Sequence, residues 1–200
     1  MATILTSLRN TVIAGVVLAV VLFIVLTQLG LAVTSYGVDF WAYIFRYLHV
    51  GSSVMWIGLL WYFNFVQIPS MSKIPEEQKP AISKVIAPAA LFWFRWAAMV
   101  TLITGLFTAE LNGHYLVDAL LLGTQTGGHA VIGVGIWLAI IMWFNVWFVI
   151  WPNQKRSLGI VTVEPDVKAK SARTAMLFSR VNTMLSVPML LCMVGQSHLA

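Results

Sequence analysis

The chain has 200 residues, of which 60% are hydrophobic and only 10% are charged, and its mean hydropathy is +0.86. A soluble globular domain carries roughly 25% charged residues, so this composition excludes a water-soluble fold and predicts an integral membrane protein. The single cysteine, Cys192, excludes a disulfide framework, a zinc site built from cysteines and a haem attached through C-x-x-C-H. The net charge of +5 does not indicate nucleic-acid binding, because the few cations lie between apolar runs.

Five segments are long enough to cross a hydrocarbon core of about 30 Å, which requires roughly 20 apolar residues in a helix. The first follows Arg9, as a secretory signal would, but its apolar core exceeds the usual signal length, so we interpret it as a retained helix. We therefore expect an all-α bundle of five transmembrane helices that forms a single membrane domain over residues 1–200. In chain order the predicted spans are residues 11–33, 40–69, 86–110, 128–151 and 173–196.

The charges of the connecting segments predict the orientation. The segments after the first and third spans contain no Lys or Arg, whereas those after the second and fourth spans are basic. The positive-inside bias therefore places the basic segments and the N-terminus in the cytoplasm, and the C-terminus on the periplasmic side. Pro69 and Pro152 are expected to end helices, because a proline ring removes a donor and clashes with the preceding turn. The basic residues are Lys73, Lys79, Lys84, Lys155, Arg156, Lys168, Lys170 and Arg173.

Two histidines in the predicted spans are candidate metal ligands. His49 lies in the outer half of the second span, and His129 lies at the outer mouth of the fourth. Neutral imidazole is the commonest metal ligand in proteins, and histidines on facing helices can hold a haem iron. Arg46, one turn before His49, would pair with a haem propionate. Small residues that leave room for a macrocycle flank both histidines: Gly51, Ser52, Ser53, Gly127, Gly128 and Gly133.

The same residues have other interpretations, which the sequence leaves open. Small residues let membrane helices pack closely, and His, Ser and Asn commonly bond between helices, so His49 and His129 are structural in this alternative. A copper or zinc site would use three or four histidines, with His114 and His198 joining the other two, but no short ligand spacing supports it. Polar residues toward the cytoplasmic half suggest a pocket or a proton path, or else interhelical hydrogen bonds: Asn64, Asn145, Arg180 and Asn182.

Arg95 lies near the middle of the third predicted span, where a guanidinium requires an anionic or carbonyl partner. The predicted spans hold no partner for it apart from Glu110 at the far end of its own span. A haem propionate, a bound anion or a neighbouring subunit would supply the charge. We therefore count Arg95 with the candidate cofactor-binding residues. Hydrolytic chemistry is not indicated, because G-x-S-x-G, H-E-x-x-H and phosphate-binding glycine loops are absent from the sequence.

Several segments resemble the membrane domain of PuuD-type urate hydroxylases, the urate oxidase N-terminal family. This resemblance implies a bacterial inner-membrane protein that is linked to urate oxidation and passes electrons to a c-type cytochrome. Members of the family carry a C-terminal cytochrome c domain, and this chain ends after the fifth predicted span, so we expect the acceptor to be a separate cytochrome or a host complex. The segments that carry the resemblance are Trp56–Gln67, Leu91–Trp96, Gly105, Met142–Lys155 and Ser179–Met189.

A second similarity covers one helix. The segment Tyr47–Leu60 resembles the L-H-x6-W-x-G pattern of HemJ-type protoporphyrinogen oxidases, and the histidine of that pattern corresponds to His49. In those proteins the histidine is associated with haem b, so this resemblance implies the same for His49.

The leading hypothesis is a redox membrane protein that binds haem b through His49 and His129 near the outer surface. The competing hypothesis is a cofactor-free accessory subunit of a larger membrane complex, in which the many Trp and Phe side chains form contacts. A third alternative, an anion transporter that uses Arg95, is less favoured because the sequence shows no internal repeat.

Overall fold

The computed structural model describes residues 2–32 and 35–199, with side chains at 4–32 and 35–196, and all regular structure in these ranges is helical. This confirms the predicted all-helical fold. Four helices are long and apolar enough to cross a membrane, in agreement with a membrane protein: Leu8–Gln28, Lys79–Leu111, Ala130–Ser157 and Pro165–Gln196.

The second predicted span forms one continuous helical segment, Val38–Ser70, but it is not among these four. Its aromatic, Gly, Ser and His residues dilute the aliphatic content that raises hydropathy in the other helices. The number of five spans, and their orientation in the membrane, therefore remain predictions.

The chain divides into two compact units, residues 1–41 and 42–200. The first unit contains α1 (Ala2–Leu5), α2 (Leu8–Gln28) and the beginning of α3 (Val38–Trp61). Helix α2 ends at Gln28, and Gly30 follows with a φ of +69°, which suits a residue without a side chain. None of the residues of α2 is buried, so the whole helix presents apolar side chains to its surroundings, as a lipid-exposed helix would.

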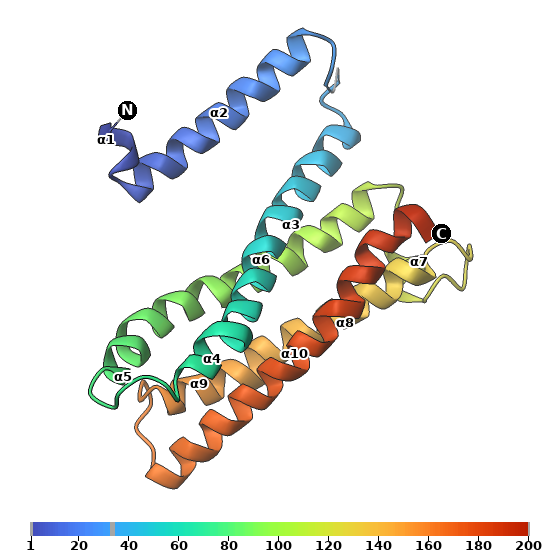
Figure 1. Ribbon diagram of the computed structural model, residues 1–200. Helices are drawn as coiled ribbons and strands as arrows, with labels where there is room; N and C mark the ends of the chain where they lie inside the picture. The colour runs from blue at the N-terminus through green and yellow to red at the C-terminus, as the bar shows by residue number, and fades with distance from the viewer. Residues whose placement is uncertain (1, 33–34, 200) are drawn as a thin grey trace. The chain divides into compact units, whose positions relative to one another are not determined.

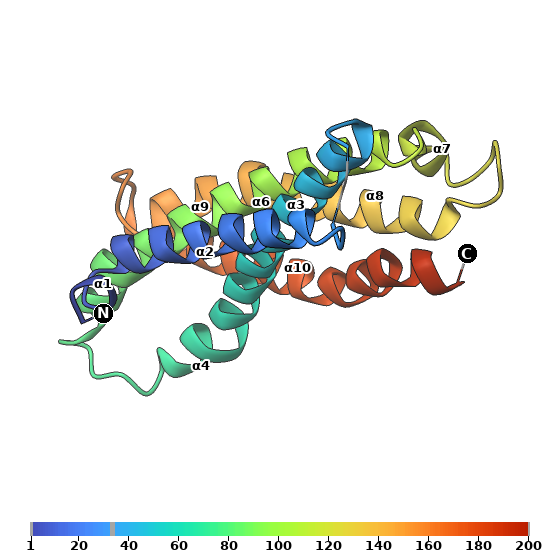
Figure 2. The same ribbon diagram turned by 90° about the horizontal axis from the view of Figure 1, so that it is seen from above.

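The second unit holds the remaining helices, with three stretches of π-helix inside longer helical segments (Figure 1). The views in Figures 1 and 2 both show α6, α8 with α9, and α10 running side by side. The elements are α3, η1 (Tyr62–Gln67), α4 (Ile68–Ser70), α5 (Lys79–Ala81), η2 (Ile82–Ile86), α6 (Ala87–Leu111), α7 (Leu116–Leu120), α8 (Ala130–Phe144), η3 (Asn145–Ile150), α9 (Trp151–Ser157) and α10 (Pro165–Leu199).

Each π-helical stretch ends two residues before a proline: Pro69, Pro88 or Pro152. A proline cannot donate to the carbonyl of the preceding turn and collides with it, and a wider turn relieves that collision. The expectation that Pro152 ends a helix was therefore wrong, because α9 continues to Ser157. At Pro69 the helix ends one residue later, at Ser70, close to the predicted boundary.

The two ends of this unit differ in charge. Figure 1 shows α4, α5 and α9 at one end, and α7 with the last turns of α10 at the other. We call the first the basic end, because it carries Lys73, Lys155 and Arg156, and the second the opposite end. In the predicted orientation the basic end faces the cytoplasm.

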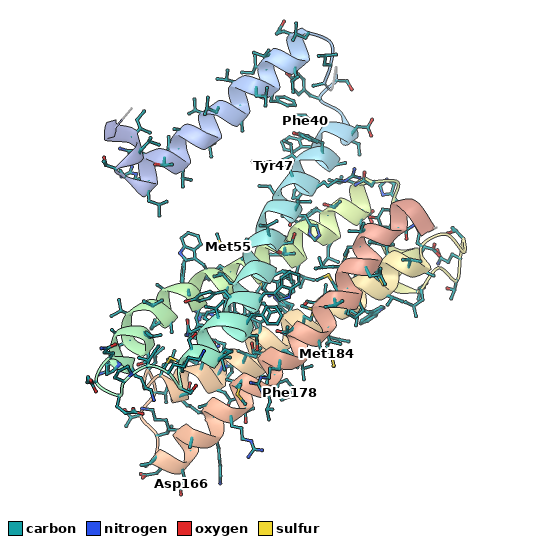
Figure 3. All side chains as sticks on the ribbon, viewed as in Figure 1. Phe40, Tyr47, Met55, Asp166, Phe178 and Met184 are labelled. Carbon is teal, nitrogen blue, oxygen red and sulfur yellow. The ribbon has the colours of Figure 1, made fainter. Side chains whose placement is uncertain are left out.

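Buried apolar side chains from α3, α6, α8 and α10 form the core. A few polar side chains form hydrogen bonds between the helical segments. Asn145 Nδ2 donates to Asn182 Oδ1 at 2.8 Å, and Asn182 Nδ2 donates to the Met142 carbonyl at 2.9 Å. Asn64 Nδ2 donates to Ser179 Oγ at 2.8 Å. These contacts confirm the alternative in which the asparagines bond between helices. Apolar side chains such as Tyr47, Met55 and Met184 are exposed on the outside of the unit (Figure 3).

Gly133 allows α7 to lie directly against α8, because a Cβ at this position would overlap the carbonyl oxygen of Ala119. We expect Gly133→Ala to lower the free energy of unfolding by about 1–3 kcal/mol, since backbone rather than a side chain would have to move. The thermal unfolding midpoint in detergent measures this effect. Gly58→Ala is the matched control, because a Cβ at Gly58 meets nothing within 4 Å. Equal midpoints for the two variants would contradict the close approach.

Candidate functional site

A cavity of about 350 Å³ lies among α3, α6, α8 and α10 in the second unit. Most of its wall is apolar, which is the usual character of a site for a small molecule or a cofactor, and its volume falls within the usual range. A few polar side chains are set into that wall. They are Arg46, His49, Ser53, Thr101, Thr108 and Tyr115.

His49 is held in one orientation on this wall. Its Nδ1 lies 2.9 Å from the backbone carbonyl oxygen of Thr101 on α6. A carbonyl oxygen only accepts hydrogen bonds, so Nδ1 carries the proton and Nε2 presents a lone pair. Nε2 makes no hydrogen bond with any residue that the structure describes. A fixed imidazole with a free Nε2 is the arrangement found in histidine ligands of metals, where the bond at the other nitrogen orients the ring.

Gly105 makes room for this ring. A Cβ at Gly105 would lie 2.8 Å from both Cε1 and Nδ1 of His49. Real Cβ atoms do not approach other atoms so closely, so a larger residue on α6 would push the imidazole away from the Thr101 carbonyl. The macrocycle interpretation also included Gly51, where a Cβ would meet nothing within 4 Å, so this position borders open space.

Arg46 lines the same cavity, one turn before His49 on α3. Its Nη2 donates to Asn112 Oδ1 at 2.7 Å, just past the C-terminal end of α6. The remaining guanidinium donors of this exposed side chain lie beside the cavity. The structure therefore brings Arg46 and His49 together, as the sequence predicted.

His129 lies outside the lining of this cavity, although it is close to one of the lining residues. Its ring stacks on Tyr115, with the centroids 5.0 Å apart and the planes 13° apart. Its Nδ1 lies 2.7 Å from Oδ2 of Asp118, so this nitrogen is again the donor. The small residue Gly133, one turn after His129, does not leave room for a macrocycle, because Ala119 of α7 packs against it.

Asp118 is the residue that sequence reasoning missed, because an aspartate between two predicted spans gives no sign of its partners. It is 5% exposed, and its carboxylate accepts hydrogen bonds from the Thr126 hydroxyl, from His129 and from the backbone amides of Gln125 and Thr126. The Thr126 hydroxyl, above all, holds the pKa of Asp118 well below its ordinary value of 3.8, at about 2, against the opposing effect of burial. Gly123 and Gly127, both with positive φ, turn the chain back on Asp118 and were a detectable signal.

Tyr115 connects the two histidine environments, since it lines the cavity and stacks on His129. Burial raises the pKa of Tyr115, and the nearby charge of Arg46 opposes that shift. The phenol is therefore neutral at physiological pH, and its apolar ring lies between the cavity and His129.

Arg95 does not line the cavity. Its Cζ lies 3.3 Å from the centre of the Trp151 ring at the basic end of the unit. Its Nη1 is buried, and it has no hydrogen-bond partner among the described residues. The anionic partner expected for Arg95 is therefore not supplied by the described part of the chain.

The remaining histidines do not join His49 or His129. His114 Nδ1 lies 2.8 Å from Glu110 Oε1 on the surface, and the side chain of His198 lies outside the described residues. Among the described side chains, no group of three or more His, Cys, Asp and Glu residues is placed to hold a metal ion. The alternative of a copper or zinc site built from several histidines gains no support.

Comparison with known families gives one result. Residues 114–200 match the urate oxidase N-terminal family. This confirms the resemblance that the sequence predicted, over α7 to α10. The matched region contains Asp118, His129 and the segments Met142–Lys155 and Ser179–Met189, whereas Arg46, His49 and Arg95 lie before it. No curated protein and no solved structure matches the chain significantly.

Asp118 should make the region matched to the urate oxidase N-terminal family sensitive to acid. Because its pKa is lowered on folding, its carboxylate stabilises the folded state above about pH 4, and this contribution is lost as the pH falls toward 2. We expect Asp118→Asn to lower the thermal unfolding midpoint at pH 7 and to shrink the difference between pH 7 and pH 3. Asp166→Asn, at an exposed carboxylate, is the control and should behave as the wild type. An unchanged pH dependence in Asp118→Asn would refute this role.

Proposed function

We propose that this protein is a haem b-binding redox membrane protein related to the membrane domain of urate hydroxylases, with His49 as an axial ligand. One observation carries the proposal: His49 presents a free Nε2 on the wall of an apolar cavity while the Thr101 carbonyl fixes its ring. The match of residues 114–200 to the urate oxidase N-terminal family supports the connection to urate oxidation.

The residues of the cavity fit a haem in their chemistry. The apolar wall suits a macrocycle, the imidazole suits ferric or ferrous iron, and Arg46 provides the positive charge that a propionate requires. A haem would supply one-electron transfer when bound, while the protein sets the ligand, the burial and the access. Thr101 and Gly105 position His49, and Tyr115 closes the wall toward His129.

His129 as a second ligand remains part of the proposal. Its Nδ1 is fixed by Asp118, so the free nitrogen is again Nε2, and a carboxylate-bound histidine is a common form of metal ligand. Because His129 lies outside the lining of the cavity and Tyr115 is part of that lining, binding of one iron by both histidines would require the wall at Tyr115 to move. Ligation by His49 alone requires no such movement.

The location follows from the same features. A multi-pass protein with apolar helices and one basic end is expected in the bacterial inner membrane, with five spans and the basic end in the cytoplasm. The cavity then lies toward the periplasmic side, because Arg46 bonds to Asn112 beyond the far end of α6. A separate periplasmic c-type cytochrome, or a larger complex, would accept the electrons.

A second candidate function is a cofactor-free accessory subunit. The observation in its favour is that both histidines already make hydrogen bonds between elements, His49 to Thr101 and His129 to Asp118. In this alternative the imidazoles are interhelical contacts, and the cavity is filled by lipid or by a partner chain.

The absorption spectrum of the detergent-purified protein decides between these functions. We expect a Soret band, and a pyridine haemochrome assay that gives about one b-type haem per chain, because the cavity holds one fixed imidazole. His49→Ala should lose the haem, and His114→Ala should retain it, since His114 is an exposed histidine away from the cavity. A spectrum without a Soret band would favour the accessory subunit, and an undiminished band in His49→Ala would show that His49 does not hold the haem.

A more conservative change tests the orientation of the ligand. Gly105→Ala should displace the His49 ring and weaken haem binding at least about tenfold, as changes next to metal ligands commonly do. Haem titration of the apoprotein measures this affinity. Gly51→Ala is the control, because it lies on the same helix as His49 and a Cβ there meets nothing within 4 Å. Equal affinities for the two variants would show that the contact between His49 and Gly105 does not matter for ligation.

A further inference from the structure

Arg95 is a buried cation that lacks a hydrogen-bond acceptor. Its side chain is only 9% exposed, it makes no hydrogen bond with any described residue, and its Nη1 is fully enclosed. A guanidinium has five N–H donors, and a buried charge without acceptors is strongly unfavourable. An oxyanion would supply the hydrogen-bond acceptors that this guanidinium lacks among the described residues.

A second cation faces the same aromatic ring. Arg95 Cζ lies 3.3 Å from the centre of the Trp151 ring, and Lys155 Nζ lies 5.6 Å from it. The ion pairs among the described residues involve Glu76, Glu110 and Asp118 and include neither Arg95 nor Lys155. Two positive charges thus converge on one indole without a neighbouring carboxylate. Cation–π contact stabilises such charges but does not replace hydrogen bonds.

Trp147 carries a further hydrogen-bond donor that has no acceptor among the described residues. Trp147 lies one turn before Trp151, packs edge-on against Trp96 at a centroid distance of 5.6 Å, and has a buried Nε1 without a partner in the described chain. An indole nitrogen donates and cannot accept. The helices α6, η3 and α9 therefore carry two positive charges and unpaired donors, together with one unpaired acceptor, Gln154 Oε1, and an anion would be complementary to the charges and donors.

The position of these residues along the helices indicates where the anion would come from. Arg95 lies near the middle of the continuous helical segment Lys79–Leu111, while Trp151 and Lys155 belong to α9 at the basic end. The long side chain of Arg95 reaches from there to Trp151. In the predicted orientation Trp151 and Lys155 lie on the cytoplasmic side, where aromatic and basic side chains commonly meet lipid headgroups. Basic pockets between transmembrane helices on the cytoplasmic side commonly bind lipid phosphates.

We propose that Arg95, Trp151 and Lys155 form a phosphate-binding site at the basic end of the second unit, separate from the cavity at His49. The guanidinium binds the phosphate oxygens through parallel N–H···O bonds, and Lys155 adds a second positive charge. The Trp151 ring orients the guanidinium that lies over it. A phospholipid headgroup and free inorganic phosphate carry the same group, and the site would accept it from either source. This inference is independent of the haem proposal.

Thermal unfolding of the delipidated protein in detergent tests the site with two lipids that differ only in phosphate. Phosphatidic acid should raise the unfolding midpoint of the wild type by roughly 3 °C or more at near-saturating concentration, and diacylglycerol with the same acyl chains should not. Arg95→Gln should abolish the shift, and Lys155→Gln should reduce it. Arg156→Gln, at the adjacent exposed cation, is the control and should keep the full shift.

The outcomes separate the sources of the phosphate. A shift with phosphatidic acid alone identifies a lipid headgroup site, and an equal shift with inorganic phosphate identifies a site for the free anion. Equal shifts with phosphatidic acid and diacylglycerol, or an undiminished shift in Arg95→Gln, would overturn the proposal. If Arg95→Gln does not fold, Lys155→Gln and Arg156→Gln still give the comparison, because a reduced shift must appear only in the former.

Discussion

The need to pair polar groups without help from water governs the second unit of this protein. Lipid provides no hydrogen bonds, so each amide, hydroxyl and imidazole within the helices must find a partner in the chain or in a ligand. Asn182 illustrates the satisfied case: it is fully buried, donates to the Met142 carbonyl and accepts from Asn145. His49 is half satisfied, with Nδ1 bonded and Nε2 free, and Arg95 is unsatisfied. The share of a side chain's hydrogen-bonding groups that have partners therefore separates structural residues from candidate binding residues more clearly than residue type alone.

The fold could be predicted from composition and hydropathy because the lengths of apolar helices are fixed by the thickness of the bilayer. The all-helical class and the four apolar helices follow from that constraint. Proline behaviour could not be predicted in the same way. The sequence pattern marks Pro152 as a stop, but η3 widens the turn before it and lets α9 continue. Both η3 and α9 also pack against α10, a contact that a local sequence pattern does not contain.

The candidate site was partly predictable, for reasons that differ from residue to residue. Arg46 and His49 share one helix face at a spacing of one turn, so their meeting at one cavity follows from helix geometry. The pairing of His129 with Asp118 depends instead on a loop that reverses at Gly123 and Gly127, and hydropathy carries no information about such a reversal. Arg95 was expected to need an anionic or carbonyl partner, and this stays a prediction. Its contact with Trp151 could not be predicted, because it joins helices far apart in the sequence.

In both histidines Nδ1 is held by a hydrogen bond, but the acceptors differ. On α3 a backbone carbonyl of the neighbouring helix fixes Nδ1 of His49, whereas at the start of α8 an ionised carboxylate fixes Nδ1 of His129. A carboxylate makes an imidazole more basic and a stronger ligand than a neutral carbonyl does. If both histidines were to hold a haem iron, His129 would be the more strongly donating ligand. Of the two, only His129 lies in the region matched to the urate oxidase N-terminal family, while His49 lines the cavity on a helix before that region. A proposed site that used both histidines would therefore combine residues from inside and outside the matched region.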